Sequence, residues 1–220
     1  MRSISRILYP LACLSALSAL TVASFGATLS TVQMNVVPTF VPVGDSAVST
    51  IIRGDQGVTI TIHTKNLDPG PHTVWVLMWN DPESCTGAQG LACSPPPFGP
   101  DPPDSVAFGA GGIVGASGKG NFGFRLNVGD TSGVIGGTVQ AGLTDAAGAE
   151  LHVIIADHGD IIPGMIQEQL SNPGDAGCGG PCPVVQGAVH APGAEDAVGM
   201  QLTAIKELLN RVAARNGLKP

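Results

Sequence analysis

One stretch decides the fold, residues 69–80, which read Pro69-Gly70-Pro71-His72-Thr73-Val74-Trp75-Val76-Leu77-Met78-Trp79-Asn80. The Pro-Gly-Pro opening predicts a turn, and the β-branched and aromatic run that follows predicts a strand. Successive side chains of a strand point to opposite faces, and both faces of this one are largely apolar. The run also holds both tryptophans of the chain. We therefore expect a central strand that is covered on each side.

Other short apolar runs are typical of strands, and they cover 31–37, 47–52, 58–64, 106–116, 121–128, 151–159 and 184–190. The run at 58–64 alternates, with Val58, Ile60 and Ile62 on one face and Thr, Thr and His facing water. Its period of two marks a half-buried strand. The fold class we predict is mainly β, an immunoglobulin-like or dismutase-like antiparallel β-sandwich of seven to nine strands.

Glycine recurs in the 106–116 run, at positions 109, 111, 112 and 115. A phosphate-binding loop is excluded, because Gly118-Lys119 is followed by Gly120 rather than by Ser or Thr. We expect these glycines at bends or beneath a bulky neighbour such as Trp75 or Trp79.

The two ends of the chain differ from the middle. Residues 1–26 combine two early arginines, an apolar run and small residues before a cleavage point, which is the pattern of a secretory signal peptide. Residues 27–191 form the predicted sandwich domain. In the tail, 192–220, apolar residues recur at helical spacing over 195–215 and predict an amphipathic helix. That helix is the candidate contact for a protein partner or for self-association.

The charge of the chain excludes two classes of partner. The whole sequence has 10 Lys and Arg against 17 Asp and Glu. Cleavage after residue 26 removes Arg2 and Arg6 and no acid, which leaves a net charge of −9. We therefore expect no nucleic-acid partner and no binding to anionic membranes, because the electrostatic attraction would have the wrong sign. We also expect no membrane insertion after signal cleavage.

Four cysteines remain in the mature chain, Cys85, Cys93, Cys178 and Cys182. An even number in an exported protein predicts disulfides, and of the three pairings we favour the local ones, Cys85–Cys93 and Cys178–Cys182. A zinc site is the alternative, but Cys85-x7-Cys93 is too loose for a ligand knuckle. The first pair lies in the proline-rich segment 81–104, which we expect to be a surface loop.

Histidines are the remaining candidates for chemistry. His152 and His158 share one strand face, about 20 Å apart in a regular strand. His72 opens the central strand and His190 closes the last one, so each could lie at a sandwich end beside one of the other two. A copper or zinc site built from His152, His158 and His190, with His72 as another third ligand, is therefore one hypothesis. The interpretation we favour is that these are separate histidines, hydrogen-bonded or exposed, because no close pair fixes a geometry.

Three segments resemble a group of uncharacterised exported bacterial proteins: 72–85, 118–126, and 148–152 continuing to His158-Gly159. The resemblance extends to about residue 190 and implies export and a β-rich domain, with no known activity or ligand. A looser likeness is to copper/zinc superoxide dismutase and chordin-type sandwiches, which also turn into a His-bearing strand after Pro-Gly. This chain lacks the His-x-His pair of the dismutase copper site, so no catalytic residue is carried over.

Two functions follow from these observations as expectations. The first is an exported, secreted or periplasmic binding or structural module without catalysis or cofactor, since no Gly-x-Ser-x-Gly elbow or other catalytic motif is present. The second is the histidine-site metalloprotein, copper- or zinc-binding and redox-active.

Overall fold

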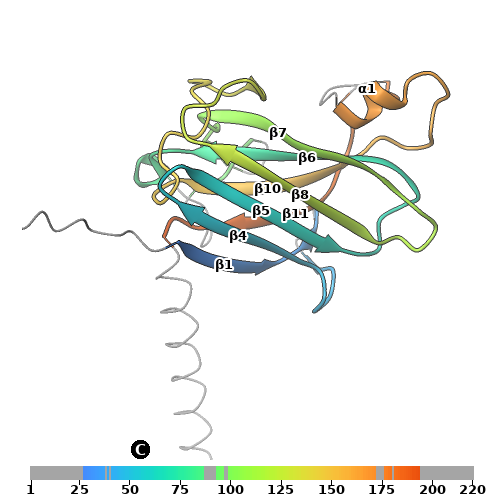
Figure 1. Cartoon of the computed structure of the whole chain (residues 1–220), viewed down its shortest axis with the longest axis horizontal. Coiled ribbons are helices and arrows are strands. Elements are labelled where there is room, and N and C mark those ends of the chain that lie inside the picture. Colours follow the sequence, from blue (N-terminus) through green and yellow to red (C-terminus); the bar gives the residue numbers. More distant parts are fainter. Residues whose placement is uncertain are drawn as a thin grey trace, which may run out of the picture.

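The computed structural model describes residues 27–37, 39, 41–86, 93–96, 99–171, 176–179 and 181–193. Within this part of the chain there are two antiparallel β-sheets, and one apolar core lies between them (Figure 1). The strand runs expected from the sequence therefore assemble into two layers.

The smaller sheet has the order β1-β4-β5-β8. Its strands are β1 (Thr28–Gln33), β4 (Val48–Gly54), β5 (Gly57–Thr64) and β8 (Gly120–Asn127). A tight turn joins β4 to β5, because Gly54 pairs with Gly57. Gly57 has a φ of 145°, a conformation that is open to glycine and strained for other residues.

The larger sheet has the order β3-β2-β11-β10-β6-β7-β9. Its strands are β2 (Asn35–Val36), β3 (Val41–Pro42), β6 (Gly70–Trp79), β7 (Ser105–Val114), β9 (Val134–Gly136), β10 (Glu150–Asp157) and β11 (Val184–His190). The decisive stretch forms β6, which lies between β10 and β7. Every residue of β6 is buried except Leu77, which is half-buried.

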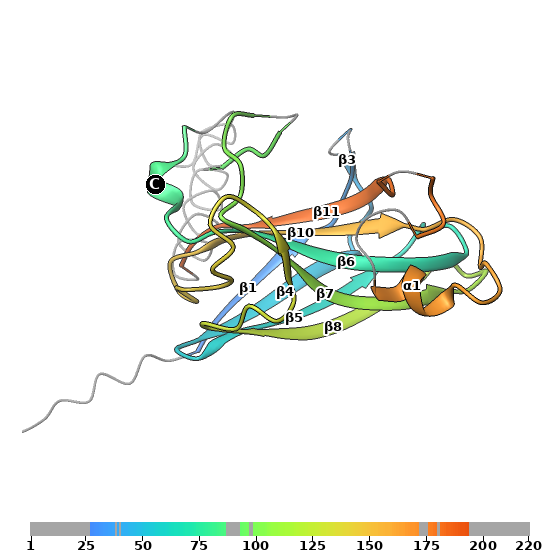
Figure 2. The same ribbon diagram turned by 90° about the horizontal axis from the view of Figure 1, so that it is seen from above.

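The main core fills the space between the sheets. The smaller sheet contributes residues such as Ile51 and Ile60, and β6 and β10 contribute Val74, Val76 and Val153. Figure 2, seen from above, shows the two layers edge-on, with β6, β10 and β11 on one side and β1, β4, β5 and β8 on the other. Alternation along β6 sends its even-numbered residues into this core.

The odd-numbered residues of β6 point to the outer face of the larger sheet. There Trp75 and Ala156 form a second apolar cluster, and Trp75 meets Phe108 edge-on with ring centroids 5.2 Å apart. Helix α1 (Ile166–Ser171) lies near β6 and β7 at one end of the molecule (Figure 2). The short 3-10 helix η1 (Pro82–Ser84) follows β6 at its other end.

Most elements predicted from the sequence are confirmed. The alternation of 58–64 is as expected, since Thr61 and His63 are exposed and the isoleucines between them are buried. Strands β3 and β9 were not predicted, and the described residues form eleven strands rather than the seven to nine that were expected. Gly109 lies beneath a bulky neighbour as expected, but that neighbour is Phe124 of the facing sheet and not a tryptophan, since a Cβ at Gly109 would collide with the Phe124 ring. The proposed signal peptide, residues 1–26, and the helix of 195–215 lie outside the described residues.

Among the described residues, no helix has both the length and the apolar character that are needed to cross a membrane.

Candidate functional site

The four histidines of the sequence hypothesis lie on two faces of the larger sheet. His190 pairs with Leu151 and His72 pairs with Asp157, so both share the inward parity of β10. His152 and His158 have the opposite parity and point to the outer face, where they contact Trp79 and Thr73. The sheet therefore separates His190 from His152, although their register positions are adjacent.

The His158 corner is the group of His158, Thr73, Trp75, Cys178 and Cys182 on the outer face. His158 is 1% exposed. Its Nε2 lies 2.8 Å from Thr73 Oγ1, and its Nδ1 lies 3.0 Å from the carbonyl oxygen of Ala176. Trp75 Nε1 donates to the same Thr73 hydroxyl at 2.8 Å. One hydroxyl thus links a tryptophan on β6 to a histidine just after β10.

The donors and acceptors of this corner assign the tautomer of His158. The Ala176 carbonyl can only accept, so His158 Nδ1 carries the proton that it receives. Trp75 Nε1 can only donate, so the Thr73 oxygen accepts that bond and its own proton is left for His158 Nε2. A neutral His158 protonated at Nδ1 satisfies each of these groups.

The Cys178–Cys182 disulfide closes beside His158, as predicted. Cys182 Sγ lies 3.2 Å from His158 Nδ1. The two sulfurs and one ring nitrogen all lie within 4.8 Å of one another, and this is the only group of three His, Cys, Asp or Glu in the described part of the chain that does so. Both sulfurs are bonded to each other in the disulfide and are not thiolates. In the oxidised protein, the imidazole of His158 is therefore the one remaining metal ligand of this group.

His152 lies toward the other end of β10, near the second disulfide. Its Nε2 lies 2.6 Å from Glu150 Oε1, which also accepts the backbone N–H of Cys93 at 3.1 Å. The ring of Trp79 packs on His152 with centroids 4.5 Å apart. Cys93 belongs to the predicted Cys85–Cys93 disulfide, which is present. Glu150, which His152 contacts, therefore ties the backbone of Cys93 to the larger sheet.

His190 points into the core and joins the two sheets. Its Nδ1 lies 3.0 Å from Ser30 Oγ and its Nε2 lies 2.9 Å from Ser49 Oγ, on strands β1 and β4. Burial is the main cause that lowers the pKa of His190 to about 3, and the positive charge of Arg53 is a smaller cause acting in the same direction. His190 is therefore a neutral imidazole at any physiological pH.

His72 is fully buried at the opposite end of the core. Its Nδ1 donates to the carbonyl oxygen of Gly70 at 3.1 Å, and its Nε2 lies 3.7 Å from Asp157 Oδ1. That separation is too long for a hydrogen bond. Nε2 has no hydrogen-bond partner among the described residues. His72 and His158 approach the same end of β10 from opposite faces of the sheet.

Arg53 is a buried residue that the sequence reasoning missed. It is 2% exposed, and its guanidinium donates to the carbonyl oxygens of Ala146, Ala149 and Ala191 at 2.8, 2.9 and 3.1 Å. Burial lowers its pKa to about 10, against the opposing effect of Asp145. The sequence did contain one indication that Arg53 is buried. In the alternating strand β4, Arg53 is on the same face as Ser49 and Ile51, and that face points inward.

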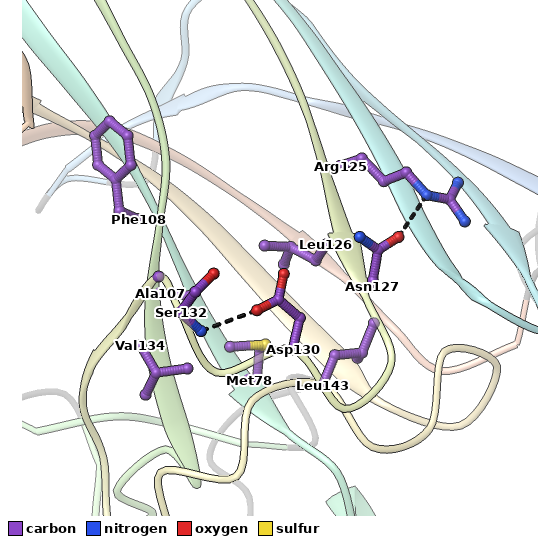
Figure 3. A pocket seen from close by; sticks show the side chains of 11 residues that line it. Met78, Ala107, Phe108, Arg125, Leu126, Asn127, Asp130, Ser132, Val134 and Leu143 are labelled. Atoms are coloured by element: carbon purple, nitrogen blue, oxygen red, sulfur yellow. Dashed lines mark hydrogen bonds between the residues drawn. The ribbon is translucent and has the colours of Figure 1, made fainter.

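A small pocket opens between the sheets beside β7 and β8 (Figure 3). Its volume is about 100 Å³, and its lining includes Met78, Leu126, Asp130 and Leu143. Asp130 is held by the backbone N–H of Ser132, which lowers the pKa of that carboxyl. Pockets that bury a drug-sized ligand measure roughly 300–1,000 Å³, so this one is small for such a ligand.

The fold and these sites define a class: a mainly β protein of two facing antiparallel sheets with two local disulfides and four buried histidines. No protein family model matches the chain, and comparison with curated proteins finds no match either.

Proposed function

We propose that this chain is an exported, non-catalytic binding or structural module. The observation that carries the proposal is the use of the buried histidines within the fold. Each holds at least one fold contact, and the partners are the carbonyls of Gly70 and Ala176, the hydroxyls of Ser30, Ser49 and Thr73, and the carboxylate of Glu150.

Such contacts suit a structural role better than a catalytic one. A general base must reach the proton that it abstracts and must be free to accept it. Both ring nitrogens of His158 and of His190 are within hydrogen-bond distance of other groups, and both residues are at most 1% exposed. Replacing His158 or His190 should therefore lower the free energy of unfolding before it affects any other property.

The alternative function, a copper- or zinc-binding and redox-active protein using His152, His158 and His190, has less support. His190 is on the inner face of the larger sheet, and the other two are on its outer face. Six residues of extended chain separate His152 from His158, about 20 Å. Ligands of one ion lie within a few Å of each other, so three separate histidines do not supply such a site.

Elemental analysis by mass spectrometry decides between the two functions. The protein is purified without added metal, beside a His152→Ala/His158→Ala double variant. The proposed module contains no stoichiometric copper or zinc. Stoichiometric metal in the wild type that is lost in the double variant would overturn the proposal in favour of the metalloprotein.

Export is part of this proposal. Two local disulfides support it, because such bonds form and persist in oxidising compartments and are rare in the cytosol. Residues 1–26 would act as the signal peptide and deliver the chain to the periplasm or the medium. The intact mass of the protein recovered from those fractions should lack the signal peptide, and a full-length mass would count against export.

The partner surface that we propose is the amphipathic helix of 195–215, with no nucleic acid and no membrane as partner. A variant lacking residues 194–220 should keep the near-ultraviolet circular dichroism of the two-sheet domain and lose partner or surface binding. Unchanged binding by that variant would remove the helix from the proposal. The sandwich subclass, immunoglobulin-like or dismutase-like, is supported by the two facing antiparallel sheets.

A further inference from the structure

The His158 corner contains three atoms of the kinds that bind metal ions, namely His158 Nδ1 and two cysteine sulfurs, but the sulfurs are bonded to each other in the disulfide. His158 Nδ1 lies 3.2 Å from Cys182 Sγ. Zinc binds sulfur at about 2.3 Å and imidazole nitrogen at about 2.0–2.1 Å, so two such ligands in a tetrahedral site lie roughly 3.5 Å apart. The nitrogen and one sulfur thus already have nearly the separation of two zinc ligands. Only the two sulfurs are too close, because they are bonded to each other.

We propose that reduction of the Cys178–Cys182 disulfide converts the His158 corner into a binding site for Zn²⁺, with both thiolates and His158 Nδ1 as ligands. This site differs from the histidine-only site considered above, and it uses one of those histidines with two cysteines. It goes beyond the proposed module function, which concerns the oxidised protein.

The spacing of the ligands agrees with this chemistry. Cys178-x3-Cys182 lies within the spacing of two to four residues that is common for paired zinc cysteines. Three protein ligands leave the fourth position of a tetrahedral zinc for water or another small ligand. The described neighbours of the other disulfide form no comparable group of three, so the inference is confined to this corner.

The reaction that opens the site balances with a dithiol as reductant. The dithiol supplies two electrons and two protons, the Cys178–Cys182 bond breaks, two thiols form, and the reductant closes to its own disulfide. Zn²⁺ then displaces one proton from each thiol. Cys178 is the accessible end of the bond, since it is half-buried while Cys182 is 8% exposed.

Thr73 is positioned to orient the ligating imidazole. When Nδ1 binds the metal, its proton moves to Nε2, which lies 2.8 Å from Thr73 Oγ1. The threonine oxygen then accepts from both His158 and Trp75, whose Nε1 is also 2.8 Å away. A ligating histidine commonly donates its other ring N–H in this manner, and loss of such a partner weakens binding by about 10- to 100-fold.

The test uses the mature chain carrying Cys85→Ser/Cys93→Ser, so that reduction changes only the Cys178–Cys182 bond. A phosphine reductant opens the bond, and Zn²⁺ affinity is measured by competition with a chromophoric chelator. Co²⁺ is the spectroscopic probe, because thiolate ligation gives charge-transfer absorption and a tetrahedral site gives intense visible bands. We expect one Zn²⁺ per chain after reduction and none before it.

Three variants assign the ligands. Cys178→Ser/Cys182→Ser should abolish the reduction-dependent binding. His158→Gln should weaken it more than Thr73→Val, which should weaken it by about 10- to 100-fold. If His158→Gln does not fold, the role of His158 is tested instead by NMR of the reduced protein. Addition of Zn²⁺ should then change the ¹⁵N chemical shift of His158 Nδ1.

Several results would overturn the proposal. These are equal Zn²⁺ affinity before and after reduction, binding that persists in Cys178→Ser/Cys182→Ser, an unshifted His158 Nδ1, and unfolding on reduction that Zn²⁺ does not reverse. Failure here leaves the module function standing, because that function rests on the oxidised protein.

Discussion

His152 and His190 lie on opposite faces of the larger sheet although their register positions are adjacent. His190 is opposite Leu151 and points toward Ser30 and Ser49 of the smaller sheet. His152, one residue further along β10, lies under Trp79 on the outer face. A difference of one position in the register of β10 and β11 therefore places His190 between two serines in the core and His152 against Trp79 on the outer face.

His190 should make stability depend on pH. Its folded pKa of about 3 is below the unfolded value of 6.5, so the unfolded chain binds more protons between those values. The contribution is complete above pH 6.5 and is lost as the pH falls toward 3, by about 2 kcal/mol between pH 7 and pH 5. Urea unfolding at both pH values checks this against His190→Gln.

The wild type should lose its stability advantage over His190→Gln by that amount on going from pH 7 to pH 5. His63→Gln, on the exposed face of β5, is the matched control for losing an imidazole. An advantage that stays constant across the two pH values would contradict the assignment of a neutral, buried His190.

Arg53 should be among the most costly residues to replace. Arg53→Met keeps most of the volume but leaves the carbonyls of Ala146, Ala149 and Ala191 without their donor. We expect a loss of about 3 kcal/mol or more in the free energy of unfolding, measured in urea. Arg125→Met, the same change at an exposed arginine, should stay within about 0.5 kcal/mol. Equal effects at the two positions would refute a structural role for the Arg53 contacts.

Thr73 should matter through its hydroxyl rather than its shape. Thr73→Val is nearly isosteric and leaves Trp75 Nε1 and His158 Nε2 without a partner, at a cost of about 2 kcal/mol. Thr61→Val, on the exposed side of β5, is the control and should be close to neutral. Thermal unfolding and the near-ultraviolet signal of the tryptophans report the difference. If Thr73→Val left the stability unchanged, the hydrogen bonds that link β6 to His158 would contribute nothing to the free energy of unfolding.

The strands could be predicted because their signals are local. Val58, Ile60 and Ile62 alternate with polar residues, and β6 is apolar on both faces, so each strand indicates its own environment. Strand β9 has three residues, Val134–Gly136, too few to show a period. The neighbour of Gly109 was missed because Phe124 comes from the facing sheet, and single-strand patterns do not give the alignment of two sheets.

The site was predictable only in part for the same reason. Parity along one strand correctly gave His152 and His158 the same face, and short loops gave the disulfide pairing. The partners of these residues depend on register between strands. That register brings Thr73 to His158, Glu150 under the loop of Cys93, and Ser30 to His190. None of these contacts has a signal in the spacing of the residues.

Gly111 should be required for α1 to pack on the larger sheet. A Cβ at Gly111 would collide with the carbonyl oxygen of Leu170 in α1, and backbone cannot move aside as a flexible side chain can. Gly111→Ala should therefore displace α1 and cost about 1–3 kcal/mol. Hydrogen exchange over 166–171 should speed up, while the β6 amides stay protected.

Gly123→Ala is the matched control for this change, because its Cβ would meet nothing closer than 3.9 Å, from the Ile60 carbonyl oxygen. It should be neutral or slightly stabilising, since alanine reduces the freedom of the unfolded chain. Equal hydrogen-exchange rates over 166–171 in the two variants would show that the packing of α1 does not require a residue without a Cβ at position 111. A selective change in Gly111→Ala would instead establish that contact between α1 and β7 holds the helix on the outer face, next to the His158 corner.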